Sequence, residues 1–100
     1  MAYSMIFVPN GTPDARAQLM VREAARRLYA ALDRLDAKLR IAFALAVIDG
    51  RTMLEVAELT ESSVVAVKTR VWRARRELVR RAAKDELLAQ YLDALDGGAS

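Results

Sequence analysis

The chain has 100 residues, a formal net charge of +3 at pH 7 and an apolar fraction of 54%, values typical of one small folded domain. It contains neither cysteine nor histidine, which excludes disulfides, thiolate chemistry, imidazole bases and ordinary zinc sites. No apolar run reaches the ~18 residues of a membrane span, and the start of the chain lacks the basic region of a signal peptide. We expect no metal, no cofactor and a cytoplasmic location.

The composition favours an all-α fold class, a small helical domain of four to five helices. Alanine, leucine, arginine and glutamate are abundant, whereas glycine and proline are few. Residues 1–12 are predicted to be a flexible tether or the end of an interdomain linker, with Pro9-Asn10-Gly11 as loop signals. In the alternative interpretation, the apolar cluster Ile6-Phe7-Val8 packs on another domain or chain. The domain itself is predicted to span residues 13–96, and residues 97–100 form a disordered tail.

Two helices are predicted in the first half of the domain. Thr12-Pro13-Asp14 indicates a helix start with a capping hydroxyl, a first-turn proline and an acid, and the helix runs to about Leu35. Its inward stripe is predicted to be Leu19, Ala24, Ala25, Leu28, Ala31, Leu32 and Leu35. Asp36 caps a second helix over 37–48, which Asp49-Gly50 ends. Its inward residues are Leu39, Phe43, Ala46 and Val47.

The second half reads as a helix-turn-helix. Thr52 and Glu55 match the capping-box pattern and open a short helix over 53–60. After the turn Glu61-Ser62-Ser63, in which either serine can cap, a long helix begins at Val64 and continues to about Ala83. Its apolar seam is Val64, Val67, Val71, Ala74 and Leu78. A helical stretch over 86–95 either extends it or stands alone, with Leu88, Tyr91, Leu92 and Leu95 on one side, and Gly97-Gly98 ends the structure.

Positive charge is concentrated on the long helix. Between Lys68 and Lys84 there are eight cations and one acid, whereas the rest of the chain has eight cations and twelve acids. A local basic stripe of this kind is typical of proteins that bind a polyanion. Opposite the seam lie Val65, Lys68, Thr69, Trp72 and Arg76, flanked by Ala66, Arg70 and Arg73 on one side and Arg75 on the other. Phosphates would relieve the like-charge repulsion along this face.

Trp72 and the arginines each allow two interpretations. An outward indole could contact a thymine methyl or a sugar, or stack on Arg76. Alternatively, Trp72 packs half-buried against another element of the domain. The arginines could likewise be a solvated face whose stems cover apolar surface.

The segment from Leu32 to Leu78, "LDRLDAKLRIAFALAVIDGRTMLEVAELTESSVVAVKTRVWRARREL", resembles region 4, the C-terminal promoter-binding domain of bacterial sigma factors, most closely the extracytoplasmic-function group. The family pattern has Glu-Ile-Ala, a turn, Val-Lys-Ser-Arg and Arg-Ala-Arg in this order. Here Glu55-Val56-Ala57, Val67-Lys68-Thr69-Arg70 and Arg73-Ala74-Arg75 stand at these elements without a gap.

The resemblance implies a sequence-specific, non-enzymatic protein that binds the minus-35 element of promoter DNA and the beta flap of RNA polymerase, and it makes an anti-sigma factor a plausible partner. By match, Lys68, Thr69, Arg70, Arg73 and Arg75 inherit DNA-binding roles, some toward phosphates. Thr52 corresponds to a phosphate-contacting hydroxyl. The full predicted DNA-binding set adds Ser63, Val65, Ala66, Trp72 and Arg76.

The sequence also departs from the family pattern. Glu61 replaces the turn glycine, which puts a Cβ and a negative charge where φ is often positive. Val65 and Ala66 replace Gly-Thr at the leading end of the recognition helix, although both can touch thymine methyls. Asp36 stands where proline is common. A full sigma factor has a further upstream domain, so the chain is either a fragment or a stand-alone relative, and we favour the fragment.

Other functions are open on sequence grounds. A LuxR-type helix-turn-helix shares the Val-Lys pair but prefers histidine near Arg70. A sigma-like interaction module would bind polymerase or an anti-sigma factor without reading DNA, which the altered leading end favours. A membrane-surface helix would need bulky apolar anchors that the valine and alanine seam lacks. An enzyme is least supported, because no nucleophile, metal cluster or phosphate loop is present and no small-molecule substrate is implied.

Overall fold

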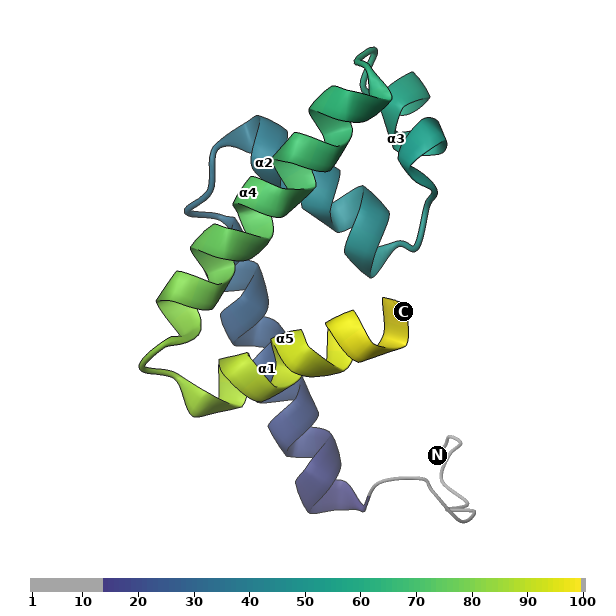
Figure 1. Ribbon diagram of the computed structural model, residues 1–100. Helices are drawn as coiled ribbons and strands as arrows, with labels where there is room; N and C mark the ends of the chain where they lie inside the picture. The colour runs from purple at the N-terminus through teal and green to yellow at the C-terminus, as the bar shows by residue number, and fades with distance from the viewer. Residues whose placement is uncertain (1–13, 100) are drawn as a thin grey trace.

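The computed structural model describes residues 14–99, with side chains as far as Leu95. Figure 1 shows this part of the chain as helices joined by short turns, with no strand among the described residues. The elements are α1 (Ala15–Leu32), α2 (Ala37–Phe43), η2 (Ala44–Ile48), α3 (Met53–Leu59), α4 (Val64–Ala82) and α5 (Glu86–Ala99). The predicted all-α fold class is confirmed, whereas the predicted tether at 1–12 lies outside the described residues.

Helix α1 begins at an aspartate cap. The Asp14 carboxylate accepts a hydrogen bond from the Ala17 N–H at 2.8 Å, so Asp14 is the cap and not the first-turn acid that the sequence predicted. The prediction that Leu19 faces inward is wrong, because this side chain is 62% exposed. The neighbour of this half of α1 is α5, which packs along the side that carries Ala17 and Ala24. Leu19 lies on another side, which none of the described helices covers.

Helix α1 ends at Leu32 and not at about Leu35. The N–H groups of Arg34 and Leu35 donate to the carbonyls of Ala31 and Leu32, the tighter spacing that closes a last turn. The chain must leave the helix here because Asp36 has a non-helical ψ of 143°, and its carboxylate caps α2 from this conformation. Leu35 is nevertheless buried, so its predicted inward position is confirmed.

The second helix has an irregular end that the sequence did not predict. After Phe43 it continues as the π-helical turn η2, in which the Asp49 N–H donates to the Ala44 carbonyl at 2.9 Å. Gly50 then reverses the chain at a φ of +72°, which favours glycine because a Cβ is strained there. Phe43 is buried as predicted, and Ala46 and Val47 are partly buried.

Helix α4 crosses the molecule (Figure 1). It contributes to two apolar cores, and the partly buried Val47 packs against both. The first core joins α4 to α1, α2 and α5, and consists of Leu28, Ala31, Leu32, Leu35, Phe43, Ala74, Leu78, Ala82, Leu88 and Leu92. The second joins the beginning of α4 to α2 and α3, and consists of Ala42, Val56, Ala57, Val67 and Val71. Because one rigid helix serves both, the position of α4 is fixed at both ends.

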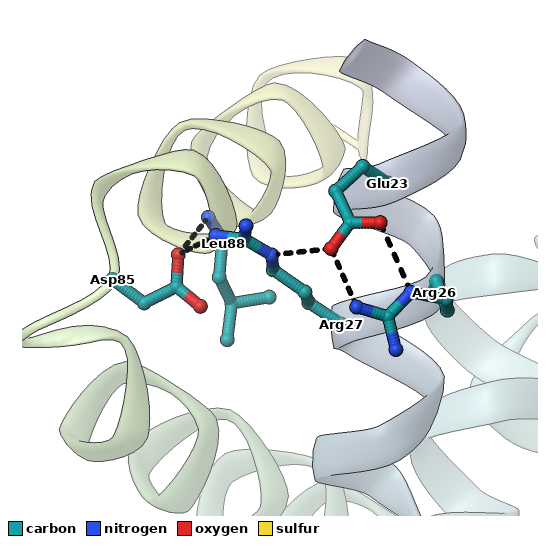
Figure 2. Close-up of polar contacts among 5 residues, drawn as sticks. All are labelled: Glu23, Arg26, Arg27, Asp85 and Leu88. Carbon is teal, nitrogen blue, oxygen red and sulfur yellow. Dashed lines mark hydrogen bonds and ion pairs between the residues drawn. The ribbon is translucent and has the colours of Figure 1, made fainter. Parts of the chain in front are cut away.

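A network of charged side chains joins α1 to the turn before α5 (Figure 2). Arg27 donates to Glu23 at 2.8 Å and to Asp85 at 2.9 Å, and Arg26 donates to Glu23 at 2.6 Å. Asp85 also accepts the Leu88 N–H at 3.2 Å, which lowers the pKa of its carboxyl together with the bond from Arg27. The bonds from Arg26 and Arg27 hold the pKa of Glu23 at about 2.

Helix α5 is therefore a separate helix and not an extension of α4, because the chain turns between them and Asp85 caps the new start. Leu88 and Leu92 are buried, and Tyr91 and Leu95 are partly buried, which confirms the predicted stripe. The prediction that Gly97-Gly98 ends the structure is wrong, since α5 continues to Ala99. A helical glycine costs only about 1 kcal/mol relative to alanine, so it weakens a helix without ending it.

Candidate nucleic-acid interface

The first helix of the helix-turn-helix starts with the predicted capping box. The Thr52 hydroxyl accepts the Glu55 N–H at 3.1 Å, and the Glu55 carboxylate accepts the Thr52 N–H at 2.9 Å. Thr52 is exposed, and its hydroxyl hydrogen is not used by this box. The start of α3 thus presents a hydrogen-bond donor to solvent.

The turn between α3 and α4 contains a strained residue. Glu61 has a φ of +53°, which costs a residue with a Cβ roughly 1–2 kcal/mol. The family pattern predicts a glycine-like position here, and the backbone of Glu61 confirms it. Of the two serines that could cap the next helix, Ser63 does so, because its hydroxyl accepts the Ala66 N–H at 3.0 Å.

Helix α4 turns its valine seam inward, as predicted. Val67, Val71, Ala74 and Leu78 are buried and Val64 is partly buried. The opposite side carries the predicted outward residues, all of them exposed: Val65, Lys68, Thr69, Trp72 and Arg76. Arg73 is exposed as well. The helix therefore presents polar and charged side chains along one continuous outer face.

The cations of this outer face are not neutralised within the part of the chain that the structure describes. Lys68, Arg73 and Arg76 pair there with no carboxylate, whereas Arg80 binds Glu77 at 2.8 Å. Of these, Arg73 and Arg76 lie three residues apart, a spacing at which like charges on a helix repel one another. A polyanion that lies along α4 would remove this repulsion and release its own counterions.

Trp72 lies on this face, among the cations. It is 57% exposed, and the Arg76 guanidinium lies 5.3 Å from its ring centroid, within the range of a cation–π contact. The alternative that Trp72 packs half-buried against another element is therefore wrong. The indole ring and the Arg76 guanidinium thus lie side by side on the surface of α4.

Three of the four predicted flanking residues are less exposed than those of the outer face, and Arg73 is the exception. Ala66, Arg70 and Arg75 are partly buried. Arg70 donates to the Ser62 hydroxyl at 3.2 Å, and the Arg75 guanidinium lies 5.8 Å from the centroid of the buried Phe43 ring. Both arginines thus make contacts inside the domain, and the bond from Arg70 to Ser62 was not predicted from the sequence.

Thr52 and Arg75 come together at one edge of the motif. They line a cavity of about 670 Å³ between α3, α4 and α5, with Ala46, Val47, Gly50, Arg51, Met53, Val71, Ala94 and Leu95. Arg51 was not among the predicted site residues, although its place next to Thr52 in the loop could have indicated it. Its guanidinium binds Asp49 at 2.7 Å.

Comparison with protein families identifies the family of this helix-turn-helix domain. The family model for sigma-70 region 4 matches residues 25–78, from the middle of α1 to Leu78 on α4. The chain belongs to the sigma-70 region 4 family. No curated protein and no solved structure matches it.

Sigma-70 region 4 is a non-enzymatic DNA-binding domain of transcription, which in sigma factors binds promoter DNA and RNA polymerase. The match contains α3, the turn and α4 as far as Leu78, including the capping box and the exposed cations up to Arg76. The start of α1 and all of α5 lie outside it. Among the described residues, no helix is suited to span a membrane and no cluster of potential ligands could hold a metal ion.

Proposed function

We propose that this chain is the C-terminal promoter-binding domain of an extracytoplasmic-function sigma factor and that α4 binds the minus-35 element in the major groove. The observation that carries the proposal is the two-sided character of α4. Its valines are buried, and Lys68, Arg73 and Arg76 are exposed without a carboxylate partner in the described chain. In a helix-turn-helix, the second helix enters the groove while the first one braces it.

The exposed residues divide by chemistry into contacts to the backbone and contacts to bases. Lys68, Arg73 and Arg76 are placed to neutralise phosphates. Thr69 can donate to a base or a phosphate, and Val65 and Ala66 can touch thymine methyls. The Trp72 ring can contact a thymine methyl or a sugar.

The hydroxyls at the two helix starts extend the interface at its edge. Ser63 accepts the Ala66 N–H, so its hydroxyl hydrogen is available for a phosphate oxygen, and the same holds for Thr52. Arg75 lies beside Thr52 and belongs to this edge. Arg70 completes the proposed set, although its bond to Ser62 suggests a role in holding the turn.

The proposal includes two protein partners. RNA polymerase would be contacted through its beta flap, and an anti-sigma factor would regulate the domain. In this interpretation the domain extends from residue 13 to the end of α5 at Ala99, and residues 1–12 are the end of a linker.

Trp72 offers a direct test, because it is the only tryptophan of the chain. Its fluorescence should change on titration with promoter duplexes, and selection from a randomised duplex pool should yield one enriched motif. The logarithm of the binding constant should fall linearly with the logarithm of salt concentration, with a slope of about −0.9 for each neutralised phosphate. A slope near zero would contradict phosphate binding by α4.

An interaction module that does not read DNA is the second candidate. It is favoured by one observation, that Val65 and Ala66 at the leading end of α4 carry no side-chain donor or acceptor. This candidate predicts binding to the beta flap with no enriched DNA sequence, so the same selection experiment separates the two.

A further inference from the structure

An apolar groove runs between α1 and α5. It has a volume of about 300 Å³ and is lined by Ala17, Met20, Val21, Ala24, Leu87, Gln90, Tyr91 and Ala94. Seven of these eight side chains are largely apolar, and Met20 and Val21 are each 51% exposed. Exposed apolar surface that is concave and continuous is typical of a binding site.

Both walls of the groove lie outside the part of the chain that matches sigma-70 region 4. The α1 wall ends at Ala24, one residue before the match begins, and the α5 wall begins at Leu87, after the match ends at Leu78. The groove is also remote from the outer face of α4, since none of the residues proposed to contact DNA lines it. A function for this groove is therefore independent of the proposed DNA binding.

The chain itself contains a segment suited to this groove. Residues 1–13 carry no charged side chain and include the apolar run Ile6-Phe7-Val8. An uncharged apolar segment can enter such a groove without the cost of desolvating a charge. Phe7, at the centre of this run, is an aromatic residue that could fill the groove.

The connection is long enough for the segment to reach. Five residues separate Val8 from Asp14, and they span up to roughly 18 Å when extended. Met20 and Ala24 lie about 9 and 15 Å along α1 from Asp14, at 1.5 Å for each residue. Pro9-Asn10-Gly11 supplies turn residues at the place where the chain has to reverse.

We propose that Ile6-Phe7-Val8 folds back along α1 and docks in the α1–α5 groove, with Phe7 between Val21 and Tyr91. The docked segment covers the exposed Met20 and Val21 side chains and holds the first half of α1 against α5. A second copy of the chain, or a different protein, is the competing occupant.

Crosslinking tests the proposal cleanly, because the chain has no cysteine of its own. The test variant is Phe7→Cys with Val21→Cys. The matched control is Phe7→Cys with Leu19→Cys, since Leu19 is similarly exposed, is closer to Phe7 along the chain than Val21 is, and does not line the groove. Circular dichroism of the reduced variants first verifies that both retain their helices.

We expect the intramolecular disulfide to form about tenfold or more faster with Val21→Cys than with Leu19→Cys, because docking raises the effective concentration on one face of α1 only. Equal rates would overturn the proposal, since they would mean that only the tether brings the thiols together. A disulfide-linked dimer of the Val21→Cys variant would overturn it in favour of a second copy.

A spin label gives an independent measurement without a cysteine in the groove. A nitroxide on Ser4→Cys should broaden the amide signals of Met20 and Tyr91 but not that of Leu54 on α3. Adding Phe7→Ser should remove this broadening while the DNA-binding constant stays unchanged. Broadening that survives Phe7→Ser, or none in the parent, would contradict docking through Phe7, whatever the outcome of the DNA-binding tests.

Discussion

Arg70 on α4 donates a hydrogen bond from Nη1 to the Ser62 hydroxyl in the preceding turn, at 3.2 Å. The Ser62 and Thr60 hydroxyls lie 2.6 Å apart, and Thr60 donates to the Val56 carbonyl at 2.7 Å. Because the Thr60 hydrogen is used in that bond, Ser62 is the donor to Thr60. The guanidinium is thus connected through two hydroxyls to the end of α3.

This connection predicts different behaviour for two neighbouring arginines. Arg70→Gln removes the charge but keeps a donor for Ser62, so the salt dependence of DNA binding should stay within error of wild type. Arg73→Gln removes an exposed charge and should lower the magnitude of the slope by about one. Arg73→Ala should likewise weaken binding across DNA sequences. Equal slope losses for Arg70→Gln and Arg73→Gln would identify Arg70 as a phosphate contact.

The orientation of α4 is tested by one substitution made at two positions. Val71→Asp places an unpaired carboxylate where only 4% of the side chain is exposed, and should cost on the order of 4 kcal/mol, enough to unfold a marginally stable domain. Val65→Asp introduces the same group where 74% of the residue is exposed and should leave the domain folded. Urea unfolding followed by circular dichroism measures both. A folded Val71→Asp variant would contradict the inward position of the seam.

The strained turn predicts a substitution that stabilises the domain. Glu61→Gly should raise the free energy of unfolding by about 1 kcal/mol, because glycine adopts the φ of +53° without a Cβ clash. Gly50→Ala makes the opposite change, because it adds a Cβ at a φ of +72°. It should lower the free energy of unfolding by about 1 kcal/mol. This cost comes from the backbone conformation alone, since the added Cβ would meet no atom within 4 Å. If Glu61→Gly destabilised the domain, the strain would be compensated elsewhere in the turn.

The charge network of Figure 2 predicts how stability depends on acid. Arg26 and Arg27 hold the pKa of Glu23 at about 2, below its ordinary value of 4.5. A depressed pKa in the folded state means that this contribution is present above pH 4.5 and is lost as the pH falls toward 2. Glu23→Gln should therefore flatten the fall in unfolding free energy over this range. Glu58→Gln, at an exposed position without a cation partner in the described chain, should leave it unchanged.

Local sequence signals predicted the helix-turn-helix well because its geometry is set by neighbouring residues. The capping box of Thr52 and Glu55, the cap by Ser63 and the inward seam of α4 depend on contacts within one or two turns. The glycine-like backbone of Glu61 followed from the family pattern.

The features that the sequence missed depend on contacts between distant elements. Leu19 has the spacing of an inward residue, but α5 covers a different side of α1. The bond from Arg70 to Ser62 needs the position of the turn relative to α4. The cavity that Thr52 and Arg75 line is also lined by Ala94 and Leu95 of α5, and this helix lies outside the family match.

The division of the interior into two cores that share α4 has a consequence for how the molecule opens. Each core is a candidate cooperative unit, and such units exchange their amide hydrogens together. When α5 and the first half of α1 separate, the residues around Val56 and Val67 keep their own packing. Amides of α1 and α5 should therefore exchange earlier than those of α3 and the beginning of α4, so that the helix-turn-helix stays folded while the end formed by α1 and α5 opens.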